Sequence, residues 1–286
     1  MRYEYTYRSG DSGYYRPVGF RPGITNGVRW LLIANVVCFI VQQLIAIAFH
    51  AEVIFGLVPV LVLLRGFVWQ PITYMFLHGG IFHLLWNMLA LWVFGCDVER
   101  RWGTRRFIRF YFLGGLSAAA CTLVVALINE RMAANATIGA SGAVLGILAA
   151  YAMLFPDNRI TLLLMFVLPI TMKAKTLAIG YTVITVLMIL SAPGSGGVAH
   201  FAHLGGLAFG YLYVKYGDFF EMWLRQRRAI RSQKRLWARS EQHEKYERFM
   251  REEVDPILDK ISREGVESLT RRERAILRRA QKTAHR

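Results

Sequence analysis

Two stretches of the sequence place a nucleophile and a base among glycines. Ser141 stands in Gly-Ala-Ser-Gly, immediately before an apolar run that ends at Phe155. His203 stands in Ala-His-Phe-Ala-His-Leu-Gly-Gly, residues 199–206. A serine hydroxyl becomes a nucleophile when a neighbouring base removes its proton, and histidine is the base most often used. The pair is therefore a candidate for acyl-transfer chemistry.

Each of these two residues has a simpler explanation when it is taken alone. Serine among small residues is common packing material between membrane helices, and a histidine can be a hydrogen-bonded interior residue. Glycines four apart follow both residues, at Gly142 and Gly146 and at Gly206 and Gly210. On a helix the second pair shares the face of His203, because the spacings are three and seven residues. These small faces predict the close helix approach that a Ser–His hydrogen bond requires.

A third stretch carries His83 and Asn87, which are four residues apart and share one helical face. An imidazole and an amide directed at one point can donate hydrogen bonds to an oxygen that gains negative charge in the transition state. Hydrogen bonding between helices is the alternative role for this pair. Both roles stay open from the residues alone.

The composition favours a membrane protein. Hydrophobic residues make up 55% of the 286 residues, and the mean hydropathy is +0.32. The net charge of +16 lies in segments that bracket the apolar runs, so we expect no nucleic-acid partner. Cys38, Cys96 and Cys121 have no metal-ligand spacing and are expected to be buried and reduced. No metal or cofactor is expected.

The apolar runs predict six membrane spans. They cover residues 28–49, 81–98, 107–128, 141–155, 176–190 and 198–216. The fourth run is short, because about 15 residues at 1.5 Å each reach only about 22 Å of a hydrocarbon core of about 30 Å. Residues 50–80 are expected to form an interfacial or re-entrant segment. Residues 97–106 are expected to form a tight basic turn, and 192–197 a flexible loop.

Charge sets the expected orientation. The connections that contain 99–109 and 157–175 are basic, as are the N-terminal arm and the tail, whereas the alternate connections are nearly neutral. The positive-inside rule therefore places both termini in the cytoplasm. The ends of the spans that carry His83, Ser141 and His203 then share the outer side. Three polar sites from three helices are thus expected to meet at one depth.

These motifs resemble those of the rhomboid family of intramembrane serine proteases. The matching elements are the boxes around Ser141 and His203, the stretch 76–87 that contains His83 and Asn87, and the Glu-Arg-Arg-Trp-Gly segment at 99–103. The resemblance covers roughly residues 28–216. It implies a Ser141–His203 dyad and an oxyanion hole formed by His83, Asn87 and the Ser141 backbone N–H. It also implies substrates with a single membrane span, cut near its outer end.

The sequence departs from this family at one position. The family often carries an aromatic residue four positions after the serine, beneath the catalytic histidine, and this chain has Leu145 there. His78 and His200 also recur in the family, and neither is assigned a chemical role. Two other functions stay open: an inactive member that binds membrane segments, and a metal or proton transporter that uses the four histidines.

The predicted fold is an all-α, six-span rhomboid-like bundle with a basic helical tail. Residues 1–27 form a cytoplasmic or interfacial arm, 28–216 the catalytic core, and 217–286 a cytoplasmic tail. In the tail we expect a long helix over 218–253, a short one over 255–263 and a last one that begins with a capping box, Thr270 to Glu273. The tail is either a solvated appendage or a surface for anionic lipid or another partner. The expected location is a bacterial inner membrane.

Overall fold

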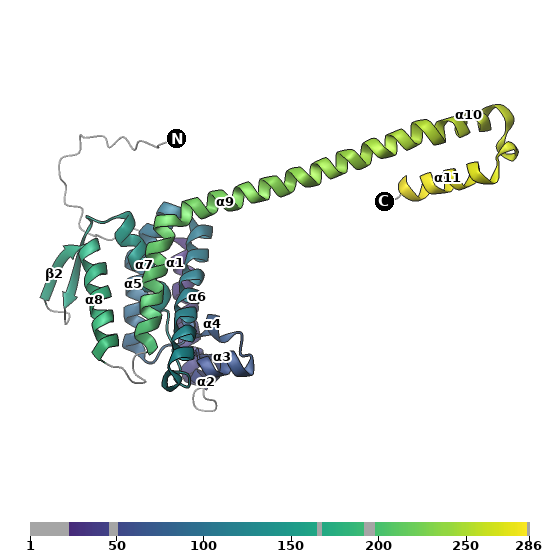
Figure 1. The fold of residues 1–286 in the computed structure, drawn as a ribbon. Coiled ribbons are helices and arrows are strands. Elements are labelled where there is room, and N and C mark those ends of the chain that lie inside the picture. Colours follow the sequence, from purple (N-terminus) through teal and green to yellow (C-terminus); the bar gives the residue numbers. More distant parts are fainter. Residues whose placement is uncertain (1–22, 46–50, 165–167, 192–197, 285–286) are drawn as a thin grey trace, which may run out of the picture. The chain divides into compact units, whose positions relative to one another are not determined.

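The computed structural model describes residues 23–45, 51–164, 168–191 and 198–284 (Figure 1). Most of the N-terminal arm and the loop 192–197 therefore lie outside the described residues. The chain divides into two compact units, Met1–Gly217 and Asp218–Arg286. Each unit is considered by itself below.

The first unit is a bundle of helices (Figure 1). Its helices are α1 (Asn26–Ile45), α5 (Ile81–Trp102), α6 (Thr104–Ile128), α7 (Ser141–Leu154), α8 (Ala174–Ser191) and the first part of α9 (Val198–Phe249). Of the described helices, α1, α5, α6 and α8 are long and apolar enough to cross a membrane, and α7 is a shorter apolar helix. The expected membrane bundle is confirmed by these four helices, whereas the count of six spans stays a prediction.

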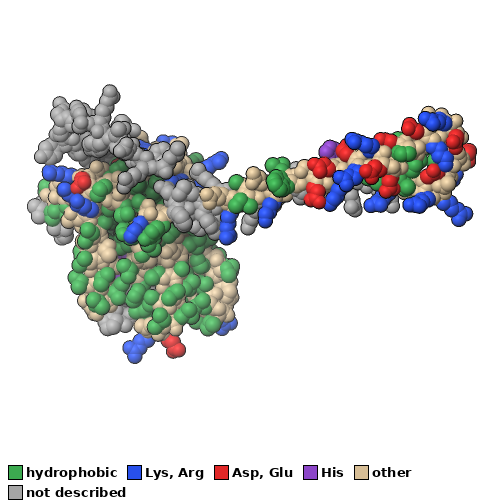
Figure 2. All heavy atoms as spheres, turned by 45° about the horizontal axis from the view of Figure 1, so that its top comes forward, with side chains coloured by type: hydrophobic (Ala, Val, Ile, Leu, Met, Phe, Trp, Pro, Cys, Tyr) green, Lys and Arg blue, Asp and Glu red, His purple; other side chains and the backbone are tan. Residues whose placement is uncertain are grey.

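Helix α7 forms the centre of this bundle. Its residues 142–152 are all buried, and it packs against α5, α6 and α8. A helix that is apolar on every side is stable only when other helices cover it, which explains its central place. Large side chains fill the contacts around it, including Tyr151, Phe107 and Phe110. The outer surface of the unit carries many exposed apolar side chains (Figure 2), as expected of a surface that faces lipid.

The segment between α1 and α5 folds into short helical pieces. They are α2 (Ala51–Phe55), α3 (Pro59–Arg65), α4 (Gln70–Thr73) and a 3-10 turn, η1 (Tyr74–Phe76). Buried Gln70 ties them together, because its amide donates to the Val53 carbonyl and accepts from the Val58 N–H. Breaks at proline and glycine explain why no long helix forms here. The absence of a regular span over 51–76 agrees with the prediction of an interfacial or re-entrant segment.

The basic turn expected over 97–106 is much shorter in the structure. Residues 97–102 continue α5, residues 104–106 begin α6, and only Gly103 breaks the helix, with a φ of 80°. The buried Glu99 side chain accepts hydrogen bonds from the backbone N–H groups of Gly27 and Val28 and from the hydroxyl of Thr25. It also accepts one from Thr104 at the start of α6. Glu99 therefore joins the beginnings of two helices to the end of a third.

The structure adds a β-hairpin that the all-α prediction lacked. Strands β1 (Arg159–Leu164) and β2 (Leu168–Lys173) pair antiparallel, with Arg159 opposite Lys173, and β2 leads into α8 (Figure 1). Asp157 closes the base of the hairpin through ion pairs with Lys173 at 3.0 Å and Lys175 at 3.3 Å. The hydrogen bond from Lys173 and the two ammonium charges hold the pKa of Asp157 below its ordinary value. Short apolar runs of this kind do not distinguish strand from helix by periodicity alone.

The second unit begins within α9, which runs without a break to Phe249. The expected boundary after residue 216 is therefore not a break in the helix, although the two compact units divide one residue later. A π-helical turn (Met250–Val254), α10 (Asp255–Glu264), the 3-10 turn η5 (Val266–Ser268) and α11 (Arg271–Ala284) follow. The capping box is confirmed, because the Glu273 carboxylate accepts from the Thr270 N–H and the Thr270 hydroxyl faces the Glu273 N–H. Residues 225–239 of this unit carry basic but no acidic side chains, and the two kinds intermix in the part that follows (Figure 2).

Candidate active site

Ser141 and His203 meet at hydrogen-bond distance. Ser141 Oγ lies 2.8 Å from His203 Nε2, although 62 residues separate them in the chain. Ser141 is the first residue of α7, and His203 lies in the second turn of α9. Both side chains are half-buried. A hydroxyl bonded to an imidazole nitrogen is the arrangement in which the imidazole can accept the hydroxyl proton.

The glycine faces predicted from the sequence let α7 and α9 approach this closely. A methyl group on Gly206 would overlap the backbone carbonyl of Gly142, and one on Gly210 would overlap the carbonyl of Gly146. Both obstacles are backbone atoms, which cannot rotate away as a side chain can. The predicted close approach of the two helices is therefore confirmed.

Substitution Gly206→Ala is expected to reduce any Ser141-dependent reaction strongly while the chain still folds. The added methyl group forces α9 away from α7, and a displacement of about 1 Å at a catalytic pair costs roughly a hundredfold in rate. Gly180→Ala on α8 is the matched control, because nothing lies within 4 Å of its added methyl group. Labelling of Ser141 by a fluorophosphonate measures the effect. Equal labelling of the two variants would show that the close approach is unimportant for reactivity.

The loop before Ser141 is held by backbone hydrogen bonds. The Gly139 N–H donates to the Tyr74 carbonyl at 2.9 Å, and Thr137 and Leu57 exchange two backbone bonds. Gly139 has a φ of 119°, a backbone conformation that residues other than glycine rarely adopt. The segment 51–76 thus fixes the direction from which the chain enters α7 at Ser141.

His83 lies beside this loop. A methyl group on Gly139 would come within 2.8 Å of Cε1 and Nε2 of His83, so the imidazole edge faces the backbone two residues before Ser141. Its Nδ1 accepts a hydrogen bond from the Gly79 N–H at 3.3 Å. This bond leaves Nε2 as the nitrogen that carries the proton in the neutral ring, directed toward the site.

Asn87 is one helical turn beyond His83 and is buried, with 6% of its surface exposed. Its Nδ2 donates to the His83 carbonyl at 2.8 Å. An amide nitrogen carries two protons, so one N–H is committed to the helix and the second can be offered to a bound group. The structure therefore brings His83 to the loop at Ser141, and it ties Asn87 to the same turn of α5.

His78 and His200 each lie next to one of the candidate site histidines. The ring centroids of His78 and His83 are 5.1 Å apart, and those of His200 and His203 are 6.0 Å apart. His78 is fully buried, and both its backbone N–H and its carbonyl bond to the side chain of Gln42 on α1. In the described ranges, the His, Cys, Asp and Glu side chains form no group of three or more that could hold a metal ion. His78 thus adjoins the site through its ring contact with His83.

Tyr181 on α8 is a site residue that the sequence reasoning missed. Its ring centroid lies 6.3 Å from that of His203, with the planes tilted by 56°. Leu145, which stands where the family often has an aromatic residue, is buried in the core of the bundle. An aromatic ring beside the histidine is therefore supplied by a different helix. No local pattern identifies Tyr181, because only the packing of α8 on the bundle brings it to the site.

Substitution Tyr181→Ala is expected to lower the turnover number of a Ser141-dependent reaction by roughly tenfold to a hundredfold, because the His203 ring loses a neighbour that limits its rotation. Tyr181→Phe keeps the ring and is expected to behave like the wild type. Comparison of kcat and KM for the two variants measures this effect. A Phe variant as impaired as the Ala variant would assign the role to the hydroxyl group instead.

Comparison with known proteins identifies the family. A model described as the rhomboid domain matches residues 65–217, which is more than half of the chain. The chain belongs to the rhomboid family. Together with four described helices of sufficient length and apolarity, this membership makes it an integral membrane protein.

Three relatives illustrate the range of this family. The chain is 29% identical over 147 residues to the rhomboid protease GluP of Bacillus subtilis, covering 51% of this chain and 25% of GluP. It is 34% identical over 146 residues to RHOMBOID-like protein 1 of Arabidopsis thaliana, covering 51% and 33%. It is 32% identical over 142 residues to the mitochondrial presenilin-associated rhomboid-like protein of Rattus norvegicus, covering 50% and 36%. The aligned part thus spans only a quarter to about a third of these relatives.

A second family model matches the C-terminal unit. Residues 242–282 match a family of unknown function, DUF6576. This region contains the end of α9 together with α10 and α11.

Proposed function

We propose that this chain is an intramembrane serine endopeptidase that cuts single-span membrane proteins. The observation that carries the proposal is the 2.8 Å contact between Ser141 Oγ and His203 Nε2 at the beginnings of two closely packed helices. Membership of the rhomboid family, with a relative named as a protease, supports the same reaction class. The nucleophile and base form a dyad.

The reaction begins when His203 accepts the Ser141 proton and Ser141 Oγ attacks the scissile carbonyl carbon. The carbonyl oxygen becomes an oxyanion, and His203 then donates its proton to the leaving amine. An acyl-enzyme ester at Ser141 remains after the amine departs. Water attacks this ester with His203 again as base, which releases the acid product and restores the serine.

His83 Nε2–H, the second amide N–H of Asn87 and the Ser141 backbone N–H are the proposed oxyanion donors. The position of His83 beside Gly139 supports its role as a donor, and the position of Asn87 one turn further along α5 supports the same role. The first N–H groups of a helix have no partner within the helix, so the Ser141 N–H suits an anion. Removal of one such donor costs on the order of a hundredfold to a thousandfold in rate.

The proposed topology has six spans with both termini in the cytoplasm. α7 and the first part of α9 are the two spans that length and hydropathy alone do not establish. The site then lies toward the outer side, and α8 is a gate through which a substrate helix reaches Ser141. A bacterial inner membrane is the proposed location, although the relatives include proteins named as mitochondrial.

The experiment that tests this function uses the full chain reconstituted in liposomes with a panel of single-span proteins. We expect cleavage within or next to the membrane segment, and labelling of the chain by a fluorophosphonate at Ser141 in the peptide mass spectrum. Labelling without cleavage would show that the site is reactive and that the panel lacks a substrate. If the chain is not labelled and no protein of the panel is cleaved, the result would favour an inactive family member that binds membrane segments.

A further inference from the structure

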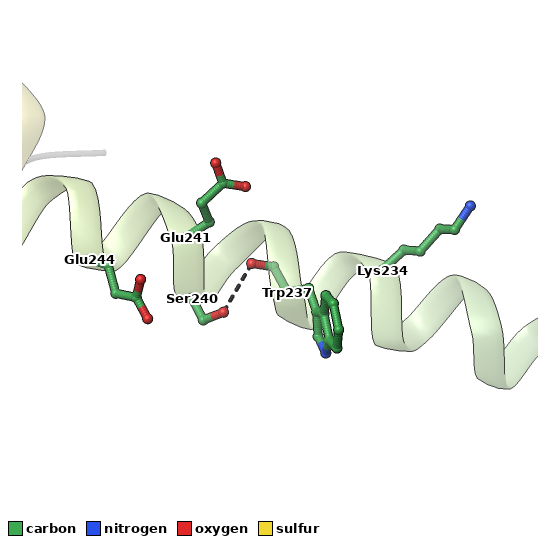
Figure 3. Close-up of a pocket in the computed structure, with 5 residues that line it drawn as sticks. All are labelled: Lys234, Trp237, Ser240, Glu241 and Glu244. Atoms are coloured by element: carbon green, nitrogen blue, oxygen red, sulfur yellow. Dashed lines mark hydrogen bonds between the residues drawn. The ribbon is translucent and has the colours of Figure 1, made fainter.

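One face of α9 in the C-terminal unit carries exposed apolar side chains without a covering element among the described residues. Ile230 and Trp237 lie seven residues apart and are 53% and 76% exposed. Seven residues are close to two helical turns, so both lie on one stripe. Trp237 is bordered on the same helix by Lys234, Ser240, Glu241 and Glu244 (Figure 3).

The charge along this helix changes sign close to Arg239. Residues 225–239 contain seven Lys and Arg and no Asp or Glu. Residues 241–259 contain seven Asp and Glu and three Lys and Arg. A helix that is basic in one half and acidic in the next is complementary to a copy of itself that runs in the opposite direction.

The positions on the stripe follow the same symmetry. Lys234 and Glu244 each lie five residues from Arg239, and Trp237 and Glu241 each lie two residues from it. In an antiparallel pair centred on Arg239, Lys234 of one copy therefore faces Glu244 of the other, twice by symmetry. Within the described part of the chain, neither Lys234 nor Glu244 forms an ion pair, whereas Glu241 pairs with Lys245 of its own helix at 2.7 Å.

We propose that two copies of this chain associate through the stripe of α9 that contains Ile230, Lys234, Trp237, Glu241 and Glu244, as an antiparallel helix pair centred on Arg239. The two Trp237 side chains lie near the two-fold axis and are covered by the facing helix. Charge complementarity selects a second copy rather than a lipid surface, because a lipid surface of one sign would repel the acidic half.

Charge reversal tests the proposal. The full chain in detergent and in nanodiscs is expected to be dimeric by light scattering. Lys234→Glu or Glu244→Lys alone is expected to weaken dimerisation by about tenfold, because each turns two attractive pairs into repulsive ones. The double variant is expected to restore it. Glu264→Lys is the control, since it changes the charge as Glu244→Lys does but lies in α10, outside the paired helix. A monomeric wild type, or a double variant no better than the single ones, would overturn the proposal.

Cross-linking tests the direction independently. With Cys38, Cys96 and Cys121 replaced by alanine, differently tagged Lys234→Cys and Glu244→Cys chains are mixed and oxidised. Antiparallel pairing predicts a disulfide between the two kinds of chain. It predicts none within either kind, because equivalent positions lie about 15 Å apart along the axis. Cross-links within each kind would establish a parallel pair and overturn the antiparallel register.

Discussion

Substitution Ser141→Ala is expected to lower proteolysis on the order of 10⁴-fold or more and to abolish fluorophosphonate labelling. The covalent step requires the hydroxyl, and removal of a nucleophile or its base leaves only the contribution of binding and of the oxyanion donors. The fold should survive, because alanine fits wherever the serine side chain fits. Cleavage rates in liposomes and the melting temperature in detergent measure the two effects separately.

His203→Ala is expected to produce a loss of similar size, because the serine and the histidine act as one unit. The double variant should then be no worse than either single variant. Ser191→Ala provides a matched control, since Ser191 lies at the end of α8 and bonds only the carbonyl of Leu187 in its own helix. Equal cleavage by the wild type and Ser141→Ala would mean that another enzyme in the preparation is responsible.

Substitution Glu99→Ala is expected to lower the free energy of unfolding by about 3–5 kcal/mol. Only 3% of Glu99 is exposed, and its carboxylate accepts from Thr25, Gly27, Val28 and Thr104 at 2.6–2.8 Å. Alanine removes the acceptor for all four donors, of which the backbone N–H groups of Gly27 and Val28 are the buried ones. Each buried donor left without a partner costs about 1–3 kcal/mol. Unfolding in mixed micelles at increasing denaturing-detergent concentration measures the change.

Asp97→Asn is the appropriate comparison for this loss. Asp97 lies two residues earlier on α5 and forms an exposed ion pair with Arg100 at 2.8 Å. Exposed pairs contribute about 0–1 kcal/mol, so the expected change is small. Glu99→Gln should fall between the two, because the amide retains one acceptor oxygen and directs its N–H group at donors. A Glu99→Ala protein as stable as Asp97→Asn would show that water replaces the carboxylate without cost.

Much of the candidate site could be predicted from the sequence alone. A serine and a histidine each followed by glycines four apart predicted two helices in close contact, because GxxxG faces are a local pattern with a direct steric meaning. His83 and Asn87 could be placed on one face by their spacing, since four residues make one helical turn. The boundaries of α7 and α8 were close to those observed, because apolar runs that end at polar residues mark the helix ends well.

Local pattern failed where neighbours distant in the chain decide the structure. Residues 97–102 looked like a charged turn, yet they are helical, and the buried Glu99 carboxylate is satisfied by donors that lie 71–74 residues earlier in the chain. For the connection over 157–175 the sequence indicated only a basic charge, whereas cross-strand pairing makes residues 159–173 a hairpin. The composition likewise did not predict that α9 continues through Gly217. The sequence changes there from apolar to charged, but the helix does not end.

What the sequence by itself determined is the set of chemical groups, the helices that carry them and the family to which the chain belongs. Only the tertiary structure decided that Ser141 Oγ lies 2.8 Å from His203 Nε2 and that Tyr181, rather than residue 145, places a ring beside His203. The physical reason is that a sequence fixes spacing along one helix, whereas the distance between two helices depends on every side chain packed between them.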